Sequence, residues 1–220
     1  MHESTTWDLE RLLAIIADAA RAHEQGTVRA QDVHGIDALD EVEIHPLLAD
    51  ALEATGWTCL REQRYPSSGA LDRSFRDRFR CDLVLLDAGT TLADPLEHAR
   101  DLDAHPLFGD QPPPGVPPED ACWIEVKVLS AARCSVATID TALDDLAKLA
   151  NDELILVGGL LFMLFAPDEA TGRETLNRAW TRGVEDGRCS HRPLIEWVPI
   201  ADRRGHGGIA IGLFRAPVSP

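Results

Sequence analysis

Charged side chains interrupt two short apolar segments of the chain. The segment RCDLVLLD at 80–87 carries Asp82 ahead of four apolar residues, and the segment ACWIEVKVL at 121–129 carries Glu125 and Lys127. Side chains of a β-strand alternate between its two faces, so Glu125 and Lys127 share one face while the apolar residues between them occupy the other. If the two segments are neighbouring strands, all three charged side chains converge at one edge of a sheet.

This group of two acids and a lysine suits metal-assisted chemistry. Carboxylates that are buried near one another repel, and a divalent cation relieves the repulsion. Hard oxygen ligands suit Mg²⁺ or Mn²⁺. A lysine beside such a site can orient or deprotonate a water and can stabilise negative charge on a phosphate. These are the parts that phosphodiester hydrolysis needs, whereas the contrary interpretation is an ordinary salt bridge on a half-exposed sheet.

The elements around these residues follow the order helix, three strands, helix, strand. The spacing of apolar residues predicts a first helix over 44–55, and a longer helix that starts near Asp37 and kinks at Pro46 is the alternative. The same reasoning predicts strands at 57–65, 80–87 and 121–129, a helix over 136–150 and a strand at 153–165. The Pro-rich loop at 88–120 separates the second and third strands.

Further elements are predicted on both sides of this region. A helix over 7–24 would start after Thr6 and end at Gly26. Beyond the core we predict a helix over 169–185 and strands at 194–200 and 208–214. We therefore divide the chain into an N-terminal helical extension (1–36), a core (37–168) and a C-terminal helix with strands that pack on the core (169–220).

This arrangement resembles the PD-(D/E)xK, or restriction-endonuclease-like, nuclease superfamily over residues 38–165. Asp82 matches the first acid of the motif and Glu125 with Lys127 matches its ExK, whereas Cys81 stands where the motif has Pro. The resemblance implies an α/β fold with an αβββαβ core, in which helices flank a mixed central sheet. It also implies catalysis in which Asp82 and Glu125 hold Mg²⁺ (or Mn²⁺) and Lys127 acts on the attacking water.

Many members of that superfamily carry a further acid on the first helix. The resemblance implies that Glu43, in the segment EVEIHPLL, fills this place as a catalytic residue and metal ligand. Glu41 and His45 are the alternatives in the same segment, and Glu62 on the first predicted strand is a weaker one. An acid at the start of a helix is also favoured by the helix dipole alone.

The basic residues of this acidic chain gather near the predicted site. The chain has 21 Lys and Arg against 37 Asp and Glu, a formal net charge of -16, which disfavours holding a polyanion by bulk charge. Arginine can grip phosphate through two hydrogen bonds and can stack on bases. The predicted contacts to nucleic acid are Arg61, Arg64, Arg73, Arg76, Arg78, Arg80 and Lys148. Neutralisation of the arginine-rich hairpin by Asp72 and Asp77 is the alternative interpretation.

These features predict a divalent-metal-dependent nuclease that acts on DNA in preference to RNA, in defence or DNA processing. The alternative is a non-catalytic acidic module on the same fold that binds a basic protein. For the nuclease, a homodimer or a partner subunit is a further expected source of affinity for nucleic acid. The longest apolar run, 154–166, falls short of the ~20 residues that a membrane span needs. The five cysteines form no CxxC pair, and the N-terminus lacks the pattern of a signal peptide, so we expect a cytoplasmic protein.

Overall fold

The computed structural model describes residues 7–66, 80–94, 115–189, 191–202 and 204–217. Its α-helices are α1 (Leu9–Arg29), α2 (Glu41–Ala54), α5 (Val136–Ala150) and α6 (Glu169–Glu185). Its strands are β1 (Trp57–Arg64), β2 (Arg80–Asp87), β3 (Cys122–Ser130), β4 (Val157–Ala166), β5 (Leu194–Pro199) and β6 (Gly208–Arg215). Within the described residues, three short 3-10 helices connect them, namely η1 (Ile36–Ala38), η3 (Pro118–Asp120) and η4 (Ala131–Arg133).

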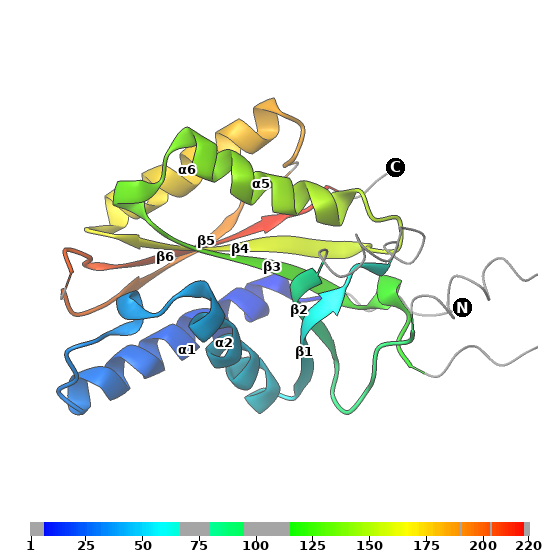
Figure 1. Ribbon diagram of the computed structural model, residues 1–220, viewed down its shortest axis with the longest axis horizontal. Helices are drawn as coiled ribbons and strands as arrows, with labels where there is room; N and C mark the ends of the chain where they lie inside the picture. Colours follow the sequence, from blue (N-terminus) through cyan, green and yellow to red (C-terminus); the bar gives the residue numbers. More distant parts are fainter. Residues whose placement is uncertain (1–6, 67–79, 95–114, 190, 203, 218–220) are drawn as a thin grey trace, which may run out of the picture.

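The six strands form one mixed sheet in the order β1-β2-β3-β4-β6-β5. Only β3 and β4 run parallel, and α5 makes the crossover between them, while every other neighbouring pair is antiparallel. Helices α1 and α2 cover one face of the sheet and α5 and α6 cover the other (Figure 1). The predicted α/β class, with a mixed sheet flanked by helices, is therefore confirmed. The two C-terminal strands extend this same sheet.

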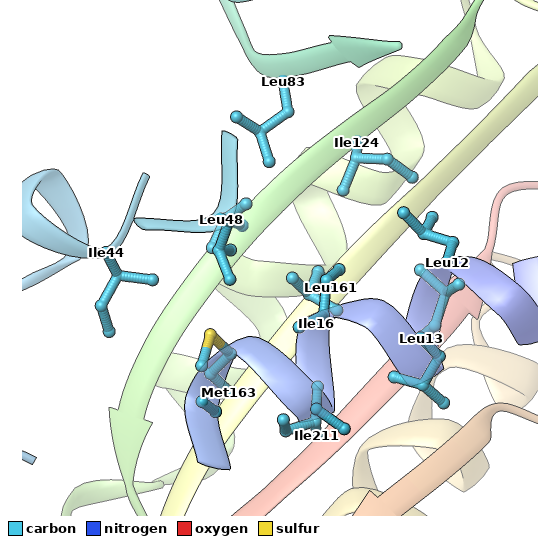
Figure 2. Packing of buried hydrophobic residues seen from close by; sticks show 14 of the residues in the cluster. Leu12, Leu13, Ile16, Ile44, Leu48, Leu83, Ile124, Leu161, Met163 and Ile211 are labelled. Carbon is cyan, nitrogen blue, oxygen red and sulfur yellow. The ribbon is translucent and has the colours of Figure 1, made fainter. Parts of the chain in front are cut away.

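Each face of the sheet carries its own apolar cluster. The cluster under α1 and α2 is seen in Figure 2 and includes Leu12, Ile16, Ile44, Leu48, Leu161, Met163 and Ile211. The opposite cluster, under α5 and α6, includes Trp123, Leu143, Leu146, Leu160, Phe162, Leu176 and Phe214. Strand β4 contributes alternate residues to both clusters, which explains why its sequence is an almost unbroken apolar run.

Helix α1 is longer than the sequence analysis predicts. Its N-cap is Asp8, whose side chain accepts the N–H of Arg11, rather than Thr6. The helix continues through Gly26 to Arg29 and ends with Ala30 in the right-handed conformation, so the expected glycine stop is not used. Helix α1 packs against β5 and β6. The proposed domain boundaries at 36 and 168 stay predictions.

Helix α2 begins at Glu41, three residues before the predicted start, and Pro46 lies inside it. Asp40 is the N-cap, and its side chain accepts the N–H of Glu43 in a capping box that defines the first turn. Pro46 has no N–H to donate to the carbonyl of Val42, and the exposure of Val42 lets water supply the missing donor. A cap contributes about 0.5–2 kcal/mol and an internal proline costs about 3 kcal/mol, so the burial of Ile44, Leu48 and Leu52 is also needed to hold the helix.

The loop between β2 and β3 is described at its two ends. Leu92 and Val116 form an isolated parallel bridge, and η3 leads into β3. The remainder, at 95–114, lies outside the described residues. Among the described helices, none is both long enough and apolar enough to cross a lipid bilayer.

Substitution of Ile16 tests whether α1 is an integral part of the core. Ile16 is completely buried under the sheet, so Ile16→Ala is expected to lower the free energy of unfolding by about 2–5 kcal/mol. Val28 lies on the same helix and is half exposed, so Val28→Ala is expected to change stability by less than about 0.5 kcal/mol. Urea denaturation measures both. Equal midpoints for the two variants would show that α1 does not pack as described.

Candidate active site

The candidate site forms where the ladder between β2 and β3 ends. These strands pair only from Leu83, opposite Ile124, to Leu85, opposite Cys122. Toward its start β2 remains paired with β1 as far as Arg80, whereas no described strand pairs with residues 125–130 of β3 on that side. This part of β3, which still pairs with β4 on its other side, is called the free edge below.

Two carboxylates bind the backbone of the free edge. The Val126 N–H donates to Asp82 Oδ2 at 2.7 Å, and the Val128 N–H donates to Glu41 Oε2 at 3.3 Å. Hydrogen bonds from backbone N–H groups to ionised carboxylates are stronger than those between neutral groups. The unpaired main chain of β3 therefore positions one acid from β2 and one from α2.

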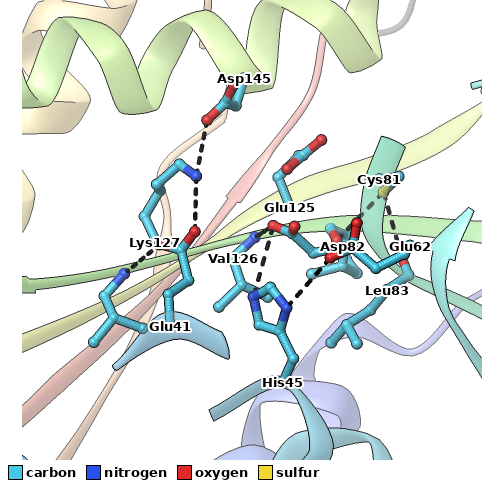
Figure 3. A network of polar contacts seen from close by, with 12 residues as sticks. Glu41, His45, Glu62, Cys81, Asp82, Leu83, Glu125, Val126, Lys127 and Asp145 are labelled. Carbon is cyan, nitrogen blue, oxygen red and sulfur yellow. Dashed lines mark hydrogen bonds and ion pairs between the residues drawn. The ribbon is translucent and has the colours of Figure 1, made fainter. Parts of the chain in front are cut away.

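Lys127 lies between acids that come from opposite faces of the sheet. Its Nζ is 3.2 Å from Glu41 Oε1 and 3.2 Å from Asp145 Oδ2 of α5 (Figure 3). Burial alone lowers the pKa of Lys127, but the carboxylates of Asp145 and Glu41 outweigh it and raise that pKa above its ordinary value. Asp145 also accepts a hydrogen bond from Lys148. Lys127 is consequently held as a cation beside the acids of the site.

Glu125 is the most buried acid of the group. Only 4% of its surface is exposed, and its carboxyl accepts a hydrogen bond from the Tyr65 hydroxyl. Burial, together with the neighbouring charge of Asp82, raises the pKa of Glu125 to about 9, although the Tyr65 hydrogen bond lowers it. Burial and the Glu125 charge also raise the pKa of Tyr65. With no metal ion bound, this raised pKa favours the protonated form of Glu125 at neutral pH.

These side chains surround a small polar cavity. Its volume is about 170 Å³, and its lining residues are Tyr65, Arg80, Asp82, Glu125, Lys127, Asp145 and Lys148. The structure thus brings together the acid of β2 and the acid and lysine of β3 that the sequence singled out. Two of the predicted nucleic-acid contacts, Arg80 and Lys148, line the same cavity.

A second group of possible ligand atoms lies on the α2 side of Asp82. One ligand atom from each of Glu41, His45 and Asp82 lies within 4.8 Å of the others. Glu41 and His45 are four residues apart on α2 and so project from the same face of that helix. His45 is buried, its Nε2 lies 4.0 Å from Asp82 Oδ2, and this nitrogen has no hydrogen-bond partner among the described residues.

The structure does not bring Glu43 to this group. Its carboxylate accepts the backbone N–H of Asp40 at 3.0 Å, as the second half of the capping box. Two residues along an α-helix turn the side chain by about 200°, so Glu43 projects away from the face that carries Glu41 and His45. Helix capping, which the sequence analysis weighed against a ligand role, accounts for this acid.

Glu62 stands opposite Asp82 on β1 at an irregularity of the strand. The β1–β2 register pairs Arg61 with Leu83 and Gln63 with Cys81 but omits the residues between them. Glu62 has a φ of 53°, a left-handed conformation that is costly for a residue other than glycine. Its Oε1 lies 3.8 Å from His45 Nδ1. The twisted backbone therefore directs an additional acid toward α2.

The other predicted nucleic-acid contacts are distributed outside the cavity. Arg61 and Arg64 are exposed on β1 and are not among its lining residues. Arg73, Arg76 and Arg78 lie outside the described residues. The Arg80 guanidinium donates to the Glu62 carbonyl at 2.8 Å, which holds this one arginine beside the acids.

Sequence reasoning missed Tyr65 and Asp145. Tyr65 is the only tyrosine of the chain and directly follows β1, but nothing in its local sequence indicates that it reaches an acid on another strand. The apolar pattern places Asp145 away from the stripe of α5, but the structure buries it at 8% exposure, three residues after Ala142 and four before Leu149. Its only sequence signal was its place on the helix that follows the ExK strand.

Comparison with protein-family models, with curated proteins and with solved structures finds no match for this chain. The fold and the site define an α/β protein with a mixed sheet. A cluster of acidic side chains and one lysine lies at the free edge of that sheet. The functional interpretation therefore rests on the chemistry of these side chains.

Proposed function

We propose that the protein is a divalent-metal-dependent nuclease with a restriction-endonuclease-like core. The observation that carries this proposal is the convergence of Asp82, Glu125 and Lys127 on one polar cavity. The order α2, β1, β2, β3, α5, β4 supports it, because this is the αβββαβ order that the resemblance implies. A surface salt bridge would not need a buried acid whose pKa is raised by burial and by a second acid.

The donor atoms suit a divalent cation, with Asp82, Glu125, Glu41 and His45 as the residues that would hold it. Ligand atoms of Glu41, His45 and Asp82 lie within 4.8 Å of one another, and the buried Nε2 of His45 has no hydrogen-bond partner among the described residues. Glu125 lies buried beside Asp82 on the cavity side, where a cation would offset the repulsion between these two acids. Carboxylates favour Mg²⁺ or Mn²⁺, and the imidazole makes Mn²⁺ the better fit of the two. When bound, the cation would supply Lewis acidity and a more acidic water.

The protein's own residues would orient and stabilise the reacting groups. Lys127 is a cation fixed by Asp145, so it can hold the scissile phosphate or the attacking water by charge and hydrogen bonding. Its raised pKa argues against a role as the base in the metal-free protein. The backbone N–H groups of Val126 and Val128 hold the carboxylates of Asp82 and Glu41 in position before the metal ion or substrate binds.

A local basic contact would have to overcome the acidity of the whole chain. Arg80 and Lys148 stand at the cavity, where they can contact the phosphates on either side of the scissile bond. The net charge of -16 makes such binding weak and strongly salt-dependent. DNA as the preferred substrate, and a role in defence or DNA processing, follow from the resemblance alone and are part of the proposal.

A cleavage assay tests the proposal. Purified protein is incubated with single-stranded and double-stranded DNA and with RNA at low salt, with Mg²⁺, Mn²⁺ or EDTA. Asp82→Asn is the matched inactive variant, because asparagine keeps an oxygen for the Val126 N–H but removes the charge. Metal-dependent cleavage that this variant lacks is the expected result. Absence of cleavage with every substrate and metal, together with capture of a basic protein, would favour the acidic binding module.

The two acids of the first α2 turn give a sharper test of the metal site. Glu41→Gln is expected to weaken Mn²⁺ binding by at least about 10-fold, because it removes a charged ligand. Glu43→Gln is the control, since glutamine also completes a capping box, and its affinity should equal that of the parent. Isothermal titration calorimetry measures both. Weaker Mn²⁺ binding in Glu43→Gln, with unchanged binding in Glu41→Gln, would support Glu43 as the metal ligand that the sequence predicts.

A further inference from the structure

A second constellation of reactive side chains lies at the far end of β3. Ser130 Oγ is 3.1 Å from His206 Nε2, and His206 Nδ1 is 3.2 Å from Asp37 Oδ2. Ser130 is the last residue of β3, His206 lies in the turn between β5 and β6, and Asp37 lies in η1. None of the three lines the polar cavity of the candidate active site.

The two hydrogen bonds are consistent with one tautomer of His206, which carries its proton on Nδ1. In this tautomer Nδ1 donates to Asp37 Oδ2. In a neutral imidazole the Nε2 is then an acceptor, and the Ser130 hydroxyl donates to it. This is the relation of nucleophile, base and orienting acid that activates a serine in unrelated hydrolase folds, where it is identified by geometry rather than by residue order.

A purely structural role does not explain why the Asp37 carboxylate is buried. Its side chain is 1% exposed, and its Oδ1 is buried without a hydrogen-bond partner among the described residues. A buried carboxylate with an unsatisfied oxygen destabilises a fold, and such groups call for a functional explanation. Ser130 and the His206 side chain, in contrast, are partly exposed to solvent, which the reaction proposed below requires.

We propose that Ser130, His206 and Asp37 form a serine-nucleophile site that reacts with small acyl esters. Ser130 Oγ bonds to the acyl carbon, its proton passes to His206 Nε2, and the bond from that carbon to the alcohol oxygen breaks. The alcohol leaves with the proton from His206, and water then hydrolyses the acyl-serine by the same route. This site acts independently of the proposed nuclease.

Covalent labelling with an alkyl fluorophosphonate tests the site in the full-length protein. The Ser130 Oγ–P bond forms, the P–F bond breaks, fluoride leaves and the serine proton passes through His206 to solvent. Intact-mass measurement is expected to show one adduct, and peptide mapping to locate it at Ser130. An unlabelled folded protein, or an adduct at any other residue, would overturn the proposal.

Three variants and a control separate an activated serine from a merely accessible one. Ser130→Ala is expected to abolish labelling, and His206→Gln and Asp37→Asn to slow it by about 100-fold or more. Ser135→Ala removes a nearby exposed hydroxyl that caps α5, and labelling should continue at the parent rate. Circular dichroism confirms that each variant is folded. Equal labelling rates in parent, His206→Gln and Asp37→Asn would show that Ser130 is not activated. The same variants should lower p-nitrophenyl acetate hydrolysis in parallel.

Discussion

Lys127→Ala is expected to lower kcat for metal-dependent cleavage of nucleic acid by roughly 10²–10³-fold, with little change in KM. The reason is that Lys127 is the cation that both Glu41 and Asp145 hold in place at the free edge. Removal of a preorganised positive group lowers transition-state stabilisation more than substrate binding. Steady-state kinetics on a labelled oligonucleotide, with the better of Mg²⁺ and Mn²⁺, measures both constants.

Lys148→Ala is the matched control, because Lys148 lines the same cavity and also pairs with Asp145. Removal of a residue that contacts only the phosphate backbone should raise KM and flatten its salt dependence, with kcat within about 3-fold of the parent. An equal loss of kcat in both lysine variants would show that Lys127 does not stabilise the transition state more than Lys148 does. Equal thermal unfolding of the two variants shows that the comparison is not distorted by misfolding.

Glu125→Gln is expected to stabilise the metal-free protein, and the gain should increase with pH. Glu125 has a folded-state pKa of about 9 against an ordinary value of 4.5. Between these values the folded protein keeps a proton that the unfolded chain has released, so rising pH lowers stability by up to about 1.4 kcal/mol per unit. Below pH 4.5 both states are protonated and the penalty vanishes. Glutamine keeps the Tyr65 contact without the charge.

Urea denaturation in EDTA at several pH values between 5 and 9 measures this effect as the difference between variant and parent. Glu169→Gln, which replaces a half-exposed glutamate of α6 that pairs with Arg173, is the matched Glu-to-Gln control and is measured in the same way. A Glu125→Gln difference that is flat across this range would show that the buried acid does not hold its proton. Addition of Mn²⁺ should instead favour the parent, which keeps the ligand.

The sequence predicted the elements well where the periodicity of apolar residues decides the structure. Strand β2 and helix α6 have the predicted bounds, and β3 differs by one residue at each end. The alternation of IEVKV was also confirmed, because Ile124 and Val126 lie in the cluster under α1 and α2. Local patterns carry this information because burial of each face selects one register.

One part of the site that was not predicted follows from a local helix cap, and the others depend on contacts between distant elements. Whether Glu41 or Glu43 faces Asp82 depends on where α2 begins, and Asp40 sets that start through a cap that the apolar pattern does not record. The contact from Tyr65 to Glu125 and the pairing of Asp145 with Lys127 likewise form only when the sheet and both helix layers assemble. Their metal, substrate and catalytic roles stay predictions.

The anchoring of Asp82 and Glu41 to peptide N–H groups has a consequence for mutational tolerance. The residue types at 126 and 128 do not contribute the donors, so conservative apolar replacements there should preserve the position of both acids. Proline is the exception, since it carries no N–H. A deep mutational scan would consequently show that the partly exposed position 128 accepts aliphatic residues and that the buried position 126 accepts those of similar volume, whereas proline is rejected at both.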